Sequence, residues 1–70
     1  MNEVEFKLTS DYIELIKLLK LLNLVESGAD AKIAVSNGEV KCNNEVELRK
    51  RKKLISGDLV EFNGENIKII

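Results

Sequence analysis

Five consecutive cations stand in a chain that is otherwise acidic. Residues 49–53 read Arg-Lys-Arg-Lys-Lys and carry +5, whereas residues 1–48 carry a net −4 and residues 54–70 a net −2. A run of like charges repels itself and adds nothing to an apolar core, so it favours either a solvated turn or an anionic partner. Because the positive charge is concentrated rather than spread, we expect one polyanion-binding patch and little non-specific adhesion elsewhere.

The other chemically active side chains do not group into a catalytic or metal site. The chain has no histidine and one cysteine, Cys42, so we expect no zinc site, internal disulfide or activated thiolate. The pairs Glu3/Glu5 and Glu45/Glu47 alternate along expected strands, whereas general acid–base catalysis needs a partnered group in a cleft. We therefore expect neither an enzyme nor a cofactor, and Cys42 is expected to be a small buried strand residue.

Length and composition predict a single domain over residues 1–70. The chain has 44% hydrophobic residues and no proline, which favours a folded core over disorder. Its first residues lack the basic and apolar regions of a secretion signal, and no apolar run approaches the ~18 residues of a membrane helix. We expect a cytoplasmic protein with no membrane contact.

A strand and a first helix are predicted before the basic run. Apolar and charged residues alternate over residues 3–8, which is the period of a half-buried strand. Ser10 is the expected cap of a helix over residues 11–22, whose apolar positions fall on one face. Tyr12 lies on that apolar face, so we expect no exposed aromatic platform for stacking bases and favour folded RNA over extended single strands.

A second helix is predicted over residues 28–36. Ser27 has the position of its N-cap, with Asp30 as the third helical residue, and Asn37–Gly38 supplies a left-handed residue to end it. Small side chains would let this helix lie close to the first helix or to a bulky ligand. Two helices joined by a short turn form a helix-turn-helix-like unit, although plain core packing explains the alanines equally well.

The second half of the chain has the period of short strands. We expect strands at residues 40–42, 46–48, 59–62 and 67–70. Asn43–Asn44 and Asn63–Gly64 are the expected tight turns. The order strand, two helices, several strands predicts an α+β fold in which the two-helix unit packs on a small, mostly antiparallel sheet.

Several segments together resemble a known RNA-binding family. They are residues 27–33, 37–43, 53–54 and 57–60, with the sequences SGADAKI, NGEVKCN, KL and GDLV. In this order and spacing they resemble the alpha-L RNA-binding motif, the domain named for ribosomal protein S-four, over about residues 10–62. The chain looks most like the small stand-alone bacterial proteins of the YbcJ and YaaA type. The resemblance implies a non-catalytic protein that holds structured RNA, with ribosomal and transfer RNA as candidates.

The resemblance also implies where RNA would bind. It places RNA against the two helices and the following hairpin, and thus implies a binding set of Ser27, Lys32, Lys41, Asn43, Arg49, Lys50, Arg51, Lys52 and Lys53. Lys17 and Lys20 on the first helix would extend this set. For Ser27 a helix cap, and for Asn43 a turn residue, is the stronger expectation from the residues themselves.

Three alternatives stay open at this point. Many relatives have an arginine at the start of the second helix, where this chain has Glu26 and Asp30, and these carboxylates would weaken phosphate contact if they lined the RNA face. The basic loop could instead dock on an acidic protein, with the first helix as an apolar surface for dimerisation. DNA is the third alternative, because a patch that reads phosphate need not distinguish the sugar.

Overall fold

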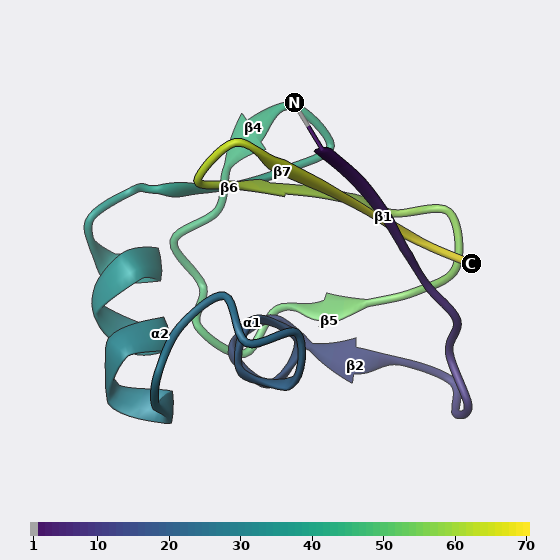
Figure 1. Cartoon of the computed structure of the whole chain (residues 1–70), viewed down its shortest axis with the longest axis horizontal. Coiled ribbons are helices and arrows are strands. Elements are labelled where there is room, and N and C mark those ends of the chain that lie inside the picture. The colour runs from purple at the N-terminus through teal and green to yellow at the C-terminus, as the bar shows by residue number, and fades with distance from the viewer. Residues whose placement is uncertain (1) are drawn as a thin grey trace.

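Two β-sheets and two short helices make up the fold. The computed structural model describes residues 2–70, with β1 (Asn2–Phe6), β2 (Ile13–Glu14), α1 (Leu15–Leu21), α2 (Gly28–Ser36), β3 (Val40–Cys42), β4 (Glu45–Val46), β5 (Lys53–Leu54), β6 (Leu59–Phe62) and β7 (Glu65–Ile69). The larger sheet has the order β1-β7-β6-β3-β4, and β2 pairs with β5 in a separate ribbon. Figure 1 shows both helices and this ribbon on the same side of the larger sheet. The α+β prediction is confirmed.

The larger sheet is mostly antiparallel, as predicted. Only the pairing of β1 with β7 is parallel; it places the first and last strands side by side at one edge of the sheet, with Asn2 opposite Glu65 and Phe6 opposite Ile69 (Figure 1). Alternate residues of β3 and β6 are buried, which gives these strands one face toward the helices and one toward solvent. The inward-facing side chains form the sheet's share of the core.

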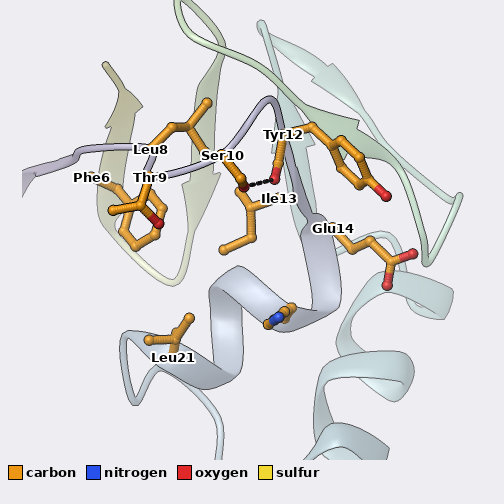
Figure 2. A pocket seen from close by; sticks show the side chains of 9 residues that line it. Phe6, Leu8, Thr9, Ser10, Tyr12, Ile13, Glu14 and Leu21 are labelled. Carbon is orange, nitrogen blue, oxygen red and sulfur yellow. Dashed lines mark hydrogen bonds between the residues drawn. The ribbon is translucent and has the colours of Figure 1, made fainter.

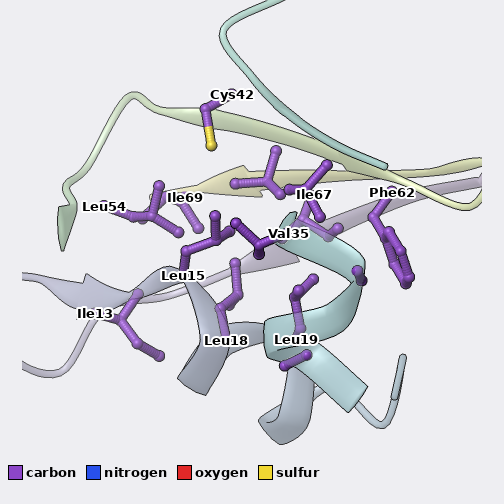
Figure 3. Packing of buried hydrophobic residues seen from close by; sticks show 14 residues of the cluster. Ile13, Leu15, Leu18, Leu19, Val35, Cys42, Leu54, Phe62, Ile67 and Ile69 are labelled. Atoms are coloured by element: carbon purple, nitrogen blue, oxygen red, sulfur yellow. The ribbon is translucent and has the colours of Figure 1, made fainter. Parts of the chain in front are cut away.

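The core lies between the larger sheet and the helices. Leu15, Leu18 and Leu19 of α1 are fully buried, and Figure 3 shows them pointing into the same cluster as Ile67 and Ile69 of β7. Burying each such side chain contributes roughly 1.5–3 kcal/mol to folding. The small residues of α2 pack here too, so plain core packing accounts for its buried alanines.

The second helix and the tight turns begin and end where the sequence predicts. The Ser27 Oγ accepts a hydrogen bond from the Asp30 amide at 3.2 Å, and Gly38 follows the helix with φ +74°. Asn43 and Asn44 both have positive φ, 53° and 70°, as a two-residue hairpin turn requires. These local sequence signals are therefore sufficient to predict the bounds of α2 and the positions of the tight turns.

The predicted start of the first helix is wrong. Residues 13–14 form β2, the helix begins at Leu15, and Ser10 does not cap it, because the Ser10 Oγ donates to the Tyr12 carbonyl at 2.9 Å. The physical reason is that β2 pairs with β5, which lies far along the chain. Tyr12 consequently stands outside the helix and is 42% exposed. Its predicted place on an apolar helix face is therefore wrong, and so is the expectation that the chain exposes no aromatic ring.

Three strand predictions need smaller corrections. The strand expected at residues 3–8 is β1, Asn2–Phe6, which ends two residues earlier. The strand expected at residues 46–48 is β4, residues 45–46, after which the chain leaves the sheet with Val46 and Leu48 exposed. The last strand begins two residues earlier than expected, at Glu65. No helix within residues 2–70 is long and apolar enough to cross a membrane.

Candidate nucleic-acid interface

The five consecutive cations lie in a loop, as predicted. This basic loop, residues 49–53, begins three residues after the last residue of β4, passes α1 and ends in the first residue of β5 (Figure 1). Its side chains are exposed, except that of Lys52, which is half-buried. The loop therefore presents concentrated positive charge to solvent.

The backbone of the basic loop caps α1. The Leu15 amide donates to the Lys52 carbonyl at 2.9 Å, and the Ile16 amide donates to the Lys50 carbonyl at 3.3 Å. The first amides of any helix have no partner within the helix, and α1 has no side-chain cap at Glu14. The loop is thus tied to the helix through its carbonyl groups, while its cationic side chains point to solvent.

One loop cation has an internal partner. The Arg49 guanidinium forms two hydrogen bonds with the Glu47 carboxylate, Nε to Oε2 at 2.9 Å and Nη2 to Oε1 at 3.1 Å, and the Arg49 amide donates to Oε2 at 3.0 Å. The hydrogen bonds from the Arg49 side chain are the main reason that the pKa of Glu47 is lowered. No ion pair within residues 2–70 engages Lys50 or Arg51, so these two are the most available cations of the loop.

The last loop cation contacts an aromatic ring. The Lys53 Nζ lies 4.9 Å from the centroid of the Tyr12 ring, within cation–π range. Lys53 also stands opposite Glu14 in the antiparallel pairing of β2 with β5. The ribbon therefore joins the basic loop to an exposed tyrosine.

The remaining predicted cations are spread over several surfaces. Lys32 is exposed on α2, and Lys17 and Lys20 are exposed on α1. Lys17 also lines an open pocket of about 520 Å³ beside Leu21, between α1 and the chain that precedes β2 (Figure 2). Their binding roles stay predictions.

Lys41 lies on a different face from the helices. It is the outward residue of β3, between the buried Val40 and Cys42, and it stands opposite Glu61 of β6. Glu39 and Glu61 line the same shallow groove as Lys41, so two carboxylates surround this cation. That surrounding opposes phosphate binding, although the role of Lys41 stays a prediction.

Two predicted polar contacts already have structural partners. The Asn43 Nδ2 donates to the Asp58 Oδ1 at 3.2 Å, and the Asn43 Oδ1 accepts from the Leu59 amide at 3.0 Å. The Ser27 Oγ is occupied by its own helix. Both side chains stabilise the fold, and their contacts with RNA stay predictions.

The remaining candidate residues are Cys42 and the two acidic residues near the start of α2. Burial raises the pKa of the Cys42 thiol to about 11, which agrees with the expected inert strand residue. Glu26 and Asp30 are exposed, and Asp30 occupies the first turn of α2, where the helix dipole favours an anion. No group of three or more histidine, cysteine or acidic residues within residues 2–70 is arranged to hold a metal ion.

Sequence reasoning overlooked two residues at this site. The Glu47 carboxylate controls how much of the Arg49 charge is free, and the only sequence signal was the spacing of two residues between opposite charges. The exposed ring of Tyr12 was assigned to a helix face. The signal that could have placed Tyr12 outside the helix was the pairing of residues 13–14 with residues 53–54.

Comparisons with known proteins agree with this geometry. A family model described as S4 domain matches residues 6–70. "Putative RNA-binding protein YbcJ" of Escherichia coli (strain K12) is 46% identical over 59 residues, 84% of each chain. "Probable ribosome maturation protein RlbA" of Bacillus subtilis (strain 168) is 40% identical over 55 residues, 79% of this chain and 78% of that protein.

A solved structure has the same fold. The solution structure of YbcJ from E. coli, described as revealing an alfaL motif involved in RNA binding, has a TM-score of 0.73 to this chain. The two sequences are 42% identical in that comparison, which covers 100% of this chain and 90% of that one. The family resemblance seen in the sequence is confirmed.

Proposed function

Because this chain belongs to the S4 domain family, we propose that it binds folded RNA without catalysing a reaction. The observation that carries the proposal is the basic loop, whose backbone is bonded to α1 while Lys50 and Arg51 stay free for phosphates. One relative bears the name of an RNA-binding protein, and a similar solved structure is described as an RNA-binding motif.

The basic loop is anchored to the rest of the fold before any RNA binds. A flexible cationic loop loses conformational freedom when it binds, and that loss weakens binding. Here two backbone hydrogen bonds and the β2–β5 ribbon hold the loop beforehand. The planar guanidinium of Arg51 suits paired phosphate oxygens, and the lysines add point charges. Folded RNA presents closely spaced phosphates at fixed positions, so a fixed loop matches it.

The class of RNA is a finer proposal. We propose ribosomal RNA, because one relative at 40% identity bears the name of a ribosome maturation protein. In this role the chain would attach as a small accessory to a large ribonucleoprotein surface. The cytoplasmic location predicted from the sequence stays a prediction.

A charge-reversal experiment tests the proposal. Fluorescence anisotropy would follow the binding of ribosomal RNA hairpins, and of duplex DNA of equal length, at several salt concentrations. The loop variant is Lys50→Glu/Arg51→Glu, and the control is Lys7→Glu/Lys68→Glu, which reverses two exposed lysines outside the loop and lowers the net charge equally.

We expect the wild type and the control to prefer RNA. If about four cations meet phosphates, the slope of log affinity against log salt should be on the order of −3. The loop variant should lose more than about tenfold in affinity and show a shallower slope. Equal losses in both variants, or no RNA binding by the wild type, would contradict the proposal.

A further inference from the structure

We propose that Tyr12 is a stacking surface for one unpaired nucleobase of the RNA held by the basic loop. The inference rests on the proposed function, because the loop supplies the phosphate contacts that bring the base to the ring. It names a ligand feature that charge alone does not imply, a nucleotide outside the paired helix.

The strand pairing directs the Tyr12 ring outward. Ile13 and Leu54 stand opposite each other in the ribbon and are buried, 8% and 0% exposed, so that pair faces the core. Side chains alternate along a strand, which puts Tyr12, Glu14 and Lys53 on the opposite face. Figure 2 shows the Tyr12 and Glu14 side chains on the same side of the chain and the Ile13 side chain on the other.

The ring is both accessible and positioned. Tyr12 is 42% exposed. A hydrogen bond of 2.9 Å from the Ser10 Oγ to the Tyr12 carbonyl holds the backbone in place. The ammonium of Lys53 lies 4.9 Å from the ring centroid. Ile55, two residues beyond Lys53, is 54% exposed and adds apolar surface after β5. An aromatic ring that binds nothing gains no stability from such exposure.

The chemistry of this surface matches a nucleotide. A nucleotide joins an anionic phosphate and an aromatic base through one ribose, and the ribbon holds the Lys53 ammonium over the Tyr12 ring. Every base has a face that stacks on an aromatic side chain, and this stacking does not depend on sequence. Bases within an A-form helix are already stacked, so the base must come from a bulge, loop or end.

The position beside the basic loop favours RNA over an acidic protein at this surface. Lys53 belongs both to the basic loop and to the ribbon, and its ammonium lies over the Tyr12 ring. An RNA strand whose phosphates bind Lys50 and Arg51 would therefore continue toward Tyr12. A carboxylate of a protein partner would pair with the cations, yet it offers no ring to stack. The combination of charge and ring is what a nucleic acid satisfies.

The test compares two RNA hairpins of equal length and charge that share the same terminal loop, so that unpaired loop bases contribute equally to both. One is fully paired in its stem, and the other carries a single unpaired 2-aminopurine in the stem. Affinity and 2-aminopurine fluorescence would be measured for the wild type, Tyr12→Ala, Tyr12→Phe and the control Val46→Ala. Val46 is 52% exposed in β4, which lies across the molecule from β2 (Figure 1).

We expect the wild type, Tyr12→Phe and Val46→Ala to prefer the hairpin with the unpaired base by about tenfold and to quench its fluorescence. Tyr12→Ala should lose the preference and the quenching while it keeps its affinity for the paired hairpin. A preference that survives in Tyr12→Ala, an equal loss for both hairpins, or equal wild-type binding to both would overturn the inference. Failure of the wild type to bind either hairpin would instead refute the RNA-binding function and, with it, this inference.

Discussion

The two helices of this fold begin in different ways. The start of α2 is capped by the side chain that precedes it, because the Ser27 Oγ accepts the amide of the third helical residue at 3.2 Å. The start of α1 is capped by the distant basic loop, whose Lys50 and Lys52 carbonyls accept the amides of Ile16 and Leu15. The start of α2 is therefore independent of the basic loop, whereas α1 and the basic loop form one structural unit.

Through this coupling, we expect the start of α1 to influence RNA binding by holding the basic loop. Three of its leucines are fully buried in the core, so the helix cannot move freely. Two hydrogen bonds to α1 and the β2–β5 ribbon hold the basic loop against this fixed helix. Changes at the start of α1 should therefore alter both stability and RNA affinity, and changes at the start of α2 should alter stability alone.

The strongest way to break this difference is to move the loop without changing its charge. Inserting two glycines after Arg51 displaces the Lys50 and Lys52 carbonyls relative to each other, and each lost hydrogen bond costs about 0.5–1.5 kcal/mol. We expect the free energy of unfolding in urea to fall by about 1–3 kcal/mol. RNA affinity should fall by about fivefold although all cations remain.

The matched control inserts two glycines between Thr9 and Ser10, in the exposed turn before β2. Lengthening that turn should cost only roughly 0.3 kcal/mol of loop entropy. RNA affinity should stay unchanged. Equal effects of the two insertions would show that α1 does not depend on the loop for its cap.

Ser27→Ala tests whether α2 begins independently of the basic loop. This variant removes the cap of α2, so the free energy of unfolding should fall by about 1 kcal/mol, as measured in urea. Ser36→Ala, at the exposed end of the same helix, is the control and should change little. RNA affinity should stay within about twofold for both variants. A larger loss for Ser27→Ala alone would give Ser27 the RNA contact that the family resemblance implied.

A substitution at Glu47 should change how much positive charge the basic loop offers to RNA. In Glu47→Gln the carboxylate that holds Arg49 is lost, so a further guanidinium becomes available to phosphate, and RNA affinity should rise by about threefold in anisotropy titrations. Glu45→Gln removes the same charge from an exposed position in β4. If both variants gain equally, the gain reflects net charge and not release of Arg49.

The smallest expected effect is the pH dependence of the same pair. Hydrogen bonds from the Arg49 side chain lower the pKa of Glu47 below its ordinary 4.5, so the folded state binds this proton less readily than the unfolded state does. The stabilisation is therefore present above pH 4.5 and is lost as the pH falls through the lowered pKa.

Thermal melts of the wild type and Glu47→Gln between pH 7 and pH 3 would measure this effect. We expect the wild type to lose about 1–2 °C relative to Glu47→Gln on acidification, because Arg49 is 71% exposed and solvent screens the pair. Parallel curves for the two proteins would rule out any contribution of the pair to stability.

Local signals made part of this structure predictable. Ser27, the small residues of α2 and Gly38 each act within one helix, so the bounds of that helix could be read directly. The asparagine turns are equally local, since Asn43 and Asn44 adopt positive φ more readily than most residues. The basic loop was recognisable because charge in a sequence does not depend on the fold.

Non-local contacts account for what the sequence did not predict. Residues 11–14 fit a helix as well as a strand, and only the partner strand at residues 53–54 decides between them. Tyr12 was misplaced for the same reason. The Arg49–Glu47 pair depends on how the chain turns after β4, and the alternating pattern continues past that point. Lys41 has a predictable alternation, and Glu39 precedes it by two residues, but the second carboxylate beside it, Glu61, comes from β6.

Chemical-shift mapping of the backbone amides during titration with a ribosomal RNA hairpin tests the central claim most directly. Binding through the anchored loop should shift the amides of residues 49–53 and, through their hydrogen bonds, those of Leu15 and Ile16. The outward residues of the larger sheet, such as Glu61 and Lys68, should not change. Shifts confined to that outer face, or shifts in the loop that leave Leu15 and Ile16 unchanged, would contradict a binding loop coupled to α1.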